Sequence, residues 1–312
     1  MDFNYTGKKI GELILPSFNI AVLMSTFNGE RYIHEQIKSI FSQENVNVSL
    51  HIWDDGSSDR TLQIIKKWQD AGFPILIQKG AHLGSSKAFL NLLLENQESD
   101  FFAFSDQDDI WEPNRLILQA QAISTREPTL VVAQRKFIDI NGHQLRKKVP
   151  LRKCPTRETA IVENLAPGNL QFFNSAAAEL ILRNIDDHIK HYDHWIFLLL
   201  SFRGRIIFTP EAIVNYRIHD SNQIGIKRFP SPHSIGIGVL DSLRQLKTLL
   251  ILNENLAESF ESLHAFQSLF LEKRPWRRIY LVLLRCKVRR SRRIESYVWK
   301  FVFLILVIIN AI

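Results

Sequence analysis

Asp106 and Asp108 are separated by one residue and directly follow the apolar run 101–104. In an extended loop, the two side chains can converge on one cation. Carboxylate oxygens are hard ligands that suit Mg or Mn, and these ions often take one or two carboxylates together with phosphate oxygens. The pair predicts a cation site beside a phosphorylated ligand. The same spacing also fits a loop that caps a following helix, and Pro113 is typical of a helix start.

A second acidic pair, Asp54 and Asp55, precedes Gly56 and Ser57. One interpretation is a turn and an N-cap for a helix beginning near Asp59. The other is that one carboxylate accepts hydrogen bonds from a nucleobase N–H or a ribose hydroxyl. The glycine pattern of dinucleotide sites and the Gly-Lys-Ser/Thr phosphate loop are both absent, which excludes those two nucleotide-binding classes.

The elements that must position these aspartates alternate along the chain from Asn19 onward. Short apolar runs and longer amphipathic stretches predict an α/β fold with a mostly parallel sheet flanked by helices. The expected strands are 20–25, 50–53, 74–77 and 101–104, and the expected helices are 32–41, 59–68 and 85–94. Open α/β sheets bind ligands beyond the carboxyl ends of their strands. Both acidic pairs fall there.

The section 130–216 is expected to complete the same domain, with strands at 130–132, 170–173 and 206–208 and a helix at 193–202. Beyond Asn222 the pattern is helical only. Leucine and phenylalanine recur at three- and four-residue steps between Leu243 and Phe270, which predicts one or two amphipathic helices with a break near Asn253.

Charge is distributed unevenly over the 312 residues, of which 46% are hydrophobic and 23% charged. This composition excludes a disordered chain. The net charge is +7, but residues 273–293 hold ten basic residues and no acidic one, which leaves 29 basic against 32 acidic residues elsewhere. Cys154 and Cys286 indicate neither a disulfide framework nor a cysteine metal site, so a reducing compartment is expected. Residues 1–18 have no continuous apolar core, which argues against a signal peptide and for the cytoplasm.

The basic stretch surrounds the apolar run 279–284, and this combination predicts association with an anionic membrane surface. The final apolar run, 301–312, has 12 residues, short of the about 20 that a spanning helix needs. It is expected to lie in the interface or to insert partly. Binding of RNA by the arginines and a simple solvated charge run are the alternatives. We expect no nucleic acid partner, because no aromatic platform for single strands accompanies the arginines.

Five ordered segments resemble family 2 glycosyltransferases, and the similarity is closest to the rhamnosyltransferase-like branch. The resemblance spans about two thirds of the chain, 20–225. The segments are the strand 20–25 with Thr-Phe-Asn-Gly at 26–29, Asp-Asp-Gly-Ser-Ser-Asp at 54–59, Ser-Asp-Gln-Asp-Asp-Ile-Trp at 105–111, His-Tyr-Asp-His-Trp at 191–195, and Tyr-Arg-Ile-His at 216–219.

The resemblance implies a GT-A fold, in which a Rossmann-like nucleotide-binding half and an acceptor-binding half share a mixed sheet. It also implies a metal-dependent transfer, with Mg or Mn, that inverts the sugar of a nucleoside diphosphate sugar. On the donor side, the resemblance implies that Thr26 and Asp55 contact the nucleoside, with Asp54 beside them, and that Arg217 and His219 lie on a loop that can close over the diphosphate. For the metal, it implies that Asp108 is the main ligand and that Asp106 contacts the ribose or the metal. On the acceptor side, it implies that Asp193 is the general base and that His194 and Trp195 shape the site.

Departures from the family pattern leave the sugar open, because His82 replaces a usual asparagine and Pro-Gly-Asn-Leu-Gln stands at 167–171. The Gln-x-x-Arg-Trp element of processive synthases is missing, which favours a single addition. A glycosidase would need two carboxylates, an acid and a base, on either side of the sugar. The position of Asp106 and Asp108 after a strand on the nucleotide side argues against that class of enzyme. Asp193 as a helix N-cap, and His194 and His219 as structural histidines, remain alternatives.

The predicted organisation is an N-terminal extension at 1–18, a GT-A glycosyltransferase domain at 19–225, an amphipathic helical region at 226–272 and a basic, apolar membrane-associating tail at 273–312. The predicted enzyme adds one sugar, with dTDP-rhamnose a possible donor, to a glycan or lipid-linked acceptor in surface polysaccharide synthesis. It would be peripheral on the inner face of the plasma membrane. The alternative is a non-catalytic sugar-nucleotide-binding or scaffolding subunit of a membrane polysaccharide assembly.

Overall fold

The computed structural model describes residues 18–80, 82–146, 157–161, 163–187, 189–220, 232–253, 255–260 and 263–264. Nearly all of the predicted N-terminal extension, the segment 221–231, and the whole basic and apolar tail lie outside these residues. The predicted membrane association of the tail therefore stays a prediction.

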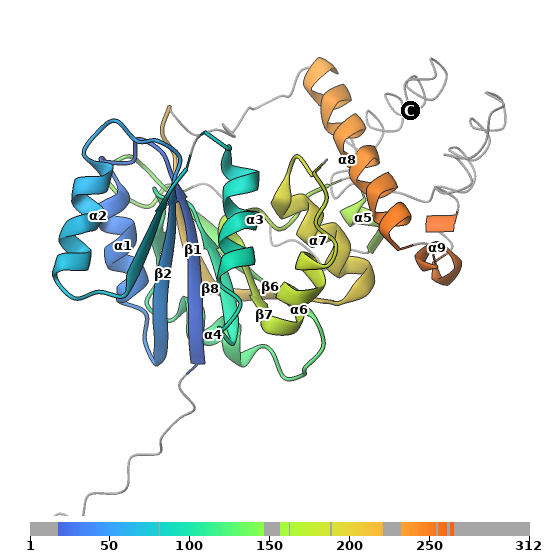
Figure 1. Ribbon diagram of the computed structural model, residues 1–312, viewed down its shortest axis with the longest axis horizontal. Coiled ribbons are helices and arrows are strands. Elements are labelled where there is room, and N and C mark those ends of the chain that lie inside the picture. The colour runs from blue at the N-terminus through green and yellow to red at the C-terminus, as the bar shows by residue number, and fades with distance from the viewer. Residues whose placement is uncertain are drawn as a thin grey trace, which may run out of the picture.

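One mixed sheet of eight strands organises the described chain (Figure 1). Its order is β3-β2-β1-β4-β7-β6-β8-β5. The strands are β1 (Phe18–Thr26), β2 (Val46–Asp54), β3 (Ile75–Lys79), β4 (Phe101–Ser105), β5 (Ile110–Trp111), β6 (Thr129–Ile138), β7 (Gln171–Asn174) and β8 (Arg205–Arg217). The predicted strands are confirmed, whereas the short strand β5 has no counterpart among the predictions.

The first four strands in this order are parallel, since β1 pairs with β2 and β4, and β2 pairs with β3. Residues Ile20 to Met24 of β1 are fully buried, as expected for a parallel strand covered on both faces. Thr26 pairs with Asp54 and Met24 with Ser105, so β1 and β2 end together and β4 ends opposite a residue two positions before the end of β1. The strand order reverses between β1 and β4, and open α/β sheets bind ligands at the crevice beyond the strand ends at such a position.

The connecting helices cover both faces of this parallel half. They are α1 (Ile33–Phe41), α2 (Thr61–Asp70) and α3 (Ser85–Glu95). In α1, Ile33, Ile37 and Ile40 recur at four- and three-residue steps and are buried, as an amphipathic helix on a sheet requires. Figure 1 shows α1 and α2 on one side of the sheet and α3 on the other. Strands β1 to β3 are added toward one edge of the sheet and β4 toward the other, and right-handed crossovers in opposite directions place their helices on opposite faces.

The second half of the sheet is mixed. β7 pairs antiparallel with β4 and β6, β6 pairs parallel with β8, and β8 pairs antiparallel with β5. Phenylalanines of β4 and β7 stack across the junction, with ring centroids 5.2 Å apart for Phe101 and Phe172 and 5.6 Å for Phe102 and Phe173. This packing joins the two halves into one core. The remaining helices of this half are α4 (Arg115–Gln121), α5 (Arg157–Ala160), α6 (Ser175–Leu182) and α7 (Tyr192–Arg203), with a 3-10 turn at Gly168–Leu170.

The described C-terminal part is helical, with α8 (Pro232–Leu252) and α9 (Leu256–Ser259). The predicted break near Asn253 is confirmed. Asp241 of α8 contacts Lys190 Nζ at 3.1 Å and His191 Nε2 at 3.7 Å, so α8 packs beside the start of α7. Within the described part of the chain, no helix has both the length and the hydropathy to cross a bilayer.

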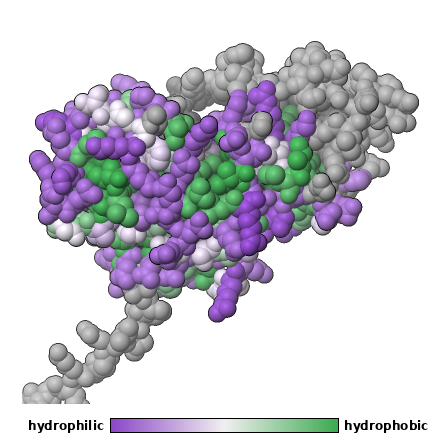
Figure 2. Space-filling model, viewed as in Figure 1, coloured by the Kyte–Doolittle hydropathy of each residue, from purple (hydrophilic) through white to green (hydrophobic). Residues whose placement is uncertain are grey.

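Hydrophilic side chains dominate the face seen in Figure 2, with hydrophobic patches between α2 and β3 and over α3. The large hydrophobic side chains with substantial exposure in the described residues include Leu76 of β3 and Leu94 of α3. Neither patch lies at the carboxyl ends of the strands, where the acidic residues gather.

Candidate active site

Four aspartates from two distant parts of the chain act on one another at the sheet crevice. The pKa of Asp106 lies well above its usual range, because burial and the neighbouring charges of Asp109, Asp108 and Asp193 all oppose its ionisation. Asp106 and Asp108 follow β4, whereas Asp193 lies in the first turn of α7. Tyr192, directly before Asp193, also packs on Phe104 of β4, with ring centroids 5.0 Å apart, so the start of α7 lies beside the strand that leads to the predicted metal ligands.

The residues at this crevice fit a cation that phosphate oxygens help to hold. In the described ranges, no group of three or more His, Cys, Asp and Glu side chains is arranged around a metal position. Two carboxylates are nevertheless sufficient when a diphosphate completes the coordination. A cation would also offset the crowded negative charge that raises the pKa of Asp106. Asp106 and Asp108 would be its ligands.

His219 contacts the predicted metal ligand directly, since its Nε2 lies 2.8 Å from Asp108 Oδ2. The ring also packs against Tyr32, with ring centroids 5.0 Å apart. This position orients the Asp108 carboxylate. The prediction that His219 lies over the diphosphate remains untested, because the segment 221–231 that follows it lies outside the described residues.

Residues 106–109, which connect β4 to β5, form the metal-ligand loop. Gln107 connects this loop to the end of β1, a role that the sequence did not predict. Its Oε1 accepts hydrogen bonds from Thr26 Oγ1 at 2.6 Å and Phe27 N at 3.0 Å, and its Nε2 donates to Phe27 O at 3.1 Å. A Cβ on Gly29 would lie 2.7 Å from Gln107 Cδ, so glycine is needed there. The middle residue of Asp-x-Asp therefore sets the spacing between two strand ends. Its only signal in the sequence was its place between the aspartates.

A buried polar network lies under the same loop. Asp109 Oδ2 accepts a hydrogen bond from Asn169 Nδ2 at 2.5 Å, and the Arg115 guanidinium donates to Asn169 O at 2.9 Å. Arg115 is fully buried and covers the Trp111 ring, with Cζ 3.7 Å from the centroid. Burial lowers the pKa of Arg115 to about 9 and raises that of Asp109 to about 7. The network fastens the metal-ligand loop to the turn before β7.

Asp193 is held by two groups that leave it pointing in a defined direction. Its Oδ2 accepts from Asn164 Nδ2 at 2.7 Å, and its Oδ1 accepts from the backbone N–H of His194 at 2.8 Å. Gln171 Nε2 donates to the backbone oxygen of Asp193 at 2.8 Å. The N-cap of α7 is His191, so the alternative that Asp193 is the N-cap is wrong.

Thr26, Asp54 and Asp55 lie at neighbouring strand ends, as the sequence predicted, but their side chains already have partners. The Thr26 hydroxyl donates to Gln107. Asp54 Oδ1 accepts from Gly56 N at 3.2 Å and Ser57 N at 2.9 Å, which confirms its turn interpretation. The N-cap of α2 is Arg60, so neither aspartate caps that helix.

Asp55 joins the end of β2 to the loop before α3. Its Oδ1 accepts from Leu83 N at 2.8 Å and its Oδ2 from Gly84 N at 3.1 Å. Two exposed rings flank this carboxylate. His82 Nδ1 lies 4.0 Å from Asp55 Oδ2, and the His82 ring meets Phe27, which is 47% exposed, edge to face at 5.1 Å. Both rings are accessible to solvent at the predicted nucleoside side.

His194 and Trp195 are both buried in this structure. Trp195 is 0% exposed and belongs to the core, because α7 is buried on nearly every face. His194 is also buried, and its Nε2 lies 2.8 Å from Ala160 O. The structural interpretation of His194 is therefore the better one. That the two residues shape the acceptor side, as the resemblance implied, stays a prediction.

Arg217 is a buried structural residue, which corrects its predicted place over the diphosphate. Its side chain is 1% exposed and forms an ion pair with Glu35. Its Nε donates to Asp108 O at 3.0 Å, one Nη donates to Ile140 O at 3.1 Å, and the guanidinium lies 4.5 Å from the Tyr32 ring centroid. Arg217 therefore supports the metal-ligand loop from below.

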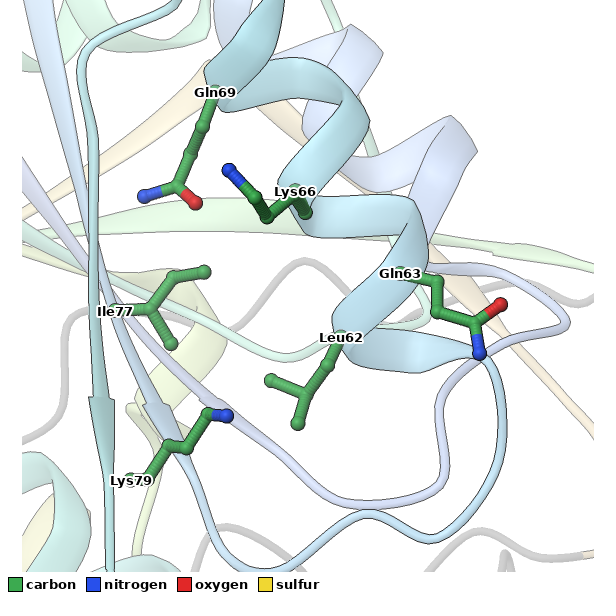
Figure 3. Close-up of a pocket in the computed structure, with 6 residues that line it drawn as sticks. All are labelled: Leu62, Gln63, Lys66, Gln69, Ile77 and Lys79. Carbon is green, nitrogen blue, oxygen red and sulfur yellow. The ribbon is translucent and has the colours of Figure 1, made fainter.

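A separate hollow of about 570 Å³ lies between α2 and β3, outside this acidic site (Figure 3). Leu62 and Ile77 form its apolar part, and Figure 3 shows Lys66 and Lys79 beside them. No carboxylate lines it, and four of its residues come from α2. It does not contribute to the site at the strand ends.

The comparison with protein families matches the model described as "Glycosyl transferase family 2" over residues 21–190. Among curated relatives, "dTDP-rhamnosyl transferase RfbG" of Shigella flexneri is 39% identical over 99 residues, 30% of this chain and 34% of that protein. "UDP-Glc:alpha-D-GlcNAc-diphosphoundecaprenol beta-1,3-glucosyltransferase WfgD" of Escherichia coli is 28% identical over 128 residues, 41% of this chain and 50% of that protein. The aligned region thus spans a third to a half of these two relatives.

Two groups of solved structures share the fold. S. aureus TarS 1-349 in complex with UDP-GlcNAc has a TM-score of 0.53 at 16% identity, covering 91% of this chain and 90% of that one. Mannosyltransferase PcManGT from Pyrobaculum calidifontis, in complex with GDP-Man and Mn2+, has a TM-score of 0.55 at 13% identity, covering 95% and 88%. These likenesses show a GT-A-like mixed α/β sheet. Because the family model covers more than half of its residues, the chain belongs to glycosyl transferase family 2, a family of glycosyltransferase enzymes.

Proposed function

We propose that this protein transfers one sugar, with inversion, from a nucleoside diphosphate sugar to a glycan or lipid-linked acceptor in surface polysaccharide synthesis. The observation that carries the proposal is the convergence of Asp106 and Asp108 with the oriented carboxylate of Asp193. Family membership supports the reaction class.

In this reaction Asp193 takes the proton of the acceptor hydroxyl while the acceptor oxygen bonds to the anomeric carbon. The bond between that carbon and the diphosphate oxygen breaks on the opposite face, which inverts the configuration. The hydrogen bonds from Asn164 and the His194 N–H hold the carboxylate in one orientation for this transfer. A bound Mg or Mn ion would supply positive charge that stabilises the departing diphosphate.

We propose dTDP-rhamnose as the first donor to test, because RfbG, a dTDP-rhamnosyl transferase, is 39% identical over its aligned segment. The exposed Phe27 and His82 beside Asp55 offer surfaces for the nucleobase.

We also propose that the protein works on the inner face of the plasma membrane through residues 273–312. The ten basic residues of 273–293 support attraction to anionic lipid. Ile251 and Leu252, at the end of α8, are exposed and add apolar surface where the chain leads toward this tail.

The test is a thermal-shift screen of dTDP-rhamnose, UDP-glucose, UDP-GlcNAc and GDP-mannose with and without Mn, followed by an assay of donor hydrolysis. A catalytic protein should show Mn-dependent stabilisation by one donor and slow release of its sugar to water. Stabilisation without turnover of the same donor, with or without a panel of glycan acceptors, would favour the non-catalytic alternative.

A further inference from the structure

Tyr192 is fixed between two aromatic rings at the start of α7, directly before Asp193. Its ring stacks on Phe89 of α3 with centroids 4.5 Å apart, and it meets Phe104 of β4 edge to face at 5.0 Å. Its backbone N–H also donates to Ser86 Oγ at 3.4 Å. These contacts come from two elements, α3 and β4, so the phenol has one direction in which to point.

The hydroxyl end of Tyr192 lies directly against Gly168. A Cβ on residue 168 would lie 2.6 Å from Tyr192 Cζ and closer still to the hydroxyl oxygen, so a side chain there would displace the phenol. Gly168 precedes Asn169, whose amide holds Asp109. The hydroxyl therefore ends beside the turn that supports the metal-ligand loop.

Both functional carboxylates act on this hydroxyl. Burial raises the pKa of Tyr192 well above its usual value, and the charges of Asp106 and Asp193 raise it further. The phenol thus remains protonated, with an O–H available as a donor. Among the described residues, no acceptor for that O–H is recorded, although the ring is packed on both sides.

We propose that the Tyr192 hydroxyl donates a hydrogen bond to a hydroxyl of the transferred sugar, in the space between Asp106 and Asp193. This inference rests on the proposed function. Asp106 belongs to the diphosphate side of the reaction and Asp193 to the acceptor side, so the sugar that moves must lie between them. A neutral O–H suits this place, because it can donate a hydrogen bond to a sugar hydroxyl without adding negative charge beside two carboxyl groups.

A hydrogen bond from Tyr192 to the sugar should affect the affinity for the whole donor and not the affinity for the nucleoside diphosphate. Tyr192→Phe keeps the ring contacts with Phe89 and Phe104 and removes only the O–H. A neutral hydrogen bond contributes about 0.5 to 1.5 kcal/mol, which corresponds to a change of roughly two- to thirteenfold in affinity. We expect this loss for a nucleoside diphosphate sugar and no loss for the nucleoside diphosphate alone.

The experiment measures calorimetric affinities of the full chain, in the presence of Mn, for UDP, dTDP and each donor of the panel, together with kcat and KM for donor hydrolysis. Thr209→Val is the control, because it also removes one hydroxyl; the Thr209 hydroxyl is buried, has no hydrogen-bond partner in the described residues and lies in β8, away from the acidic residues. The expected result is a loss of affinity and a lower kcat/KM for the donor with Tyr192→Phe only.

Equal loss of UDP or dTDP affinity and of donor affinity would assign Tyr192 a merely structural role. Donor affinity and kcat/KM that are unchanged in Tyr192→Phe would also overturn the inference. In that case, turnover by the wild-type protein would still support the proposed function. If the wild-type protein neither binds nor hydrolyses any donor of the panel, the proposed function fails and the inference fails with it. Melting temperatures of both variants identify any loss of folding.

Discussion

The side-chain amide of Asn164 donates a 2.7 Å hydrogen bond to Asp193 Oδ2. Asn164 lies in the segment before β7, and Asp193 lies in the first turn of α7. The other oxygen, Asp193 Oδ1, accepts a hydrogen bond from the backbone N–H of His194, so each carboxylate oxygen has one hydrogen-bond donor. A carboxylate held in this way loses little orientational freedom when it accepts the proton of an acceptor hydroxyl.

Asp193→Asn should abolish sugar transfer and leave nucleotide binding nearly unchanged, because the amide cannot take a proton. Loss of a general base typically lowers kcat by about 10² to 10⁴-fold. Asn164→Ala should lower kcat less, since the carboxylate remains but is less well oriented. Initial rates and dTDP or UDP affinities of both variants are the measurements. Retained turnover in Asp193→Asn would remove this residue from the role of base.

Asp108→Ala should weaken Mn-dependent nucleotide binding, because it removes a predicted metal ligand and the partner of His219. Titration with dTDP or UDP, with and without Mn, measures the difference between the two affinities. Asp70→Ala is the control, since that carboxylate is exposed and contacts only Lys66 among the described side chains. Titration curves for Asp108→Ala that match the wild type would count against the cation site.

Gln107→Ala should loosen the join between the metal-ligand loop and the end of β1. It removes three hydrogen bonds and leaves the Thr26 hydroxyl without its acceptor. We expect a loss of roughly 1 to 3 kcal/mol in the free energy of unfolding, from the unmatched buried groups, with weaker nucleotide binding. Denaturant unfolding and donor titration measure the two effects. A variant with wild-type stability and affinity would show that the join is not needed.

The metal-free protein should lose stability as the pH rises from about 4 to about 7. Burial, reinforced by the charge of Asp108, raises the folded-state pKa of Asp109 to about 7, while the positive charge of Arg115 partly opposes that shift. Between the unfolded-state and folded-state pKa values, Asp109 is ionised in the unfolded chain but still protonated in the folded protein. Increasing pH therefore favours unfolding over this range, until Asp109 is ionised in both states.

Asp109→Asn should flatten this pH dependence, because the amide does not titrate. Melting temperatures in the presence of EDTA, taken at several pH values between 4 and 8, provide the measurement. Asp70→Asn, at an exposed carboxylate, is expected to retain the wild-type profile. A profile for Asp109→Asn as steep as that of the wild type would assign the effect to other groups, such as Asp106.

A chain ending at Leu271 should lose binding to vesicles that contain anionic lipid, because it lacks the ten basic residues and both apolar runs. Each basic residue near such a surface contributes about 1 kcal/mol, so the loss should be nearly complete. Co-sedimentation with phosphatidylserine and with phosphatidylcholine vesicles, at low and high salt, makes the measurement. Persistent binding of the shortened chain would refute the proposed anchor.

The local patterns of the sequence are sufficient to predict the strands, their helices and the acidic loops. Short apolar runs and apolar residues at three- and four-residue steps show which residues are buried, and these patterns are local in the sequence. The strand 101–104 and the two aspartates that follow it were therefore predictable, as was the break near Asn253. The short strand β5 was not, because two residues carry no periodicity and β5 depends on pairing with the distant β8.

The sequence by itself determined which residue types could act as cation ligands and as a base. Only the tertiary structure decided which of them remain accessible, because burial depends on contacts between segments far apart in the chain. Arg217 and Trp195 looked like ligand contacts in the motifs, yet Arg217 supports the Asp108 loop and Trp195 lies in the core. Gln107 and Asn164 had no such signal. Their roles arise from partners that folding brings together, Thr26 and Asp193.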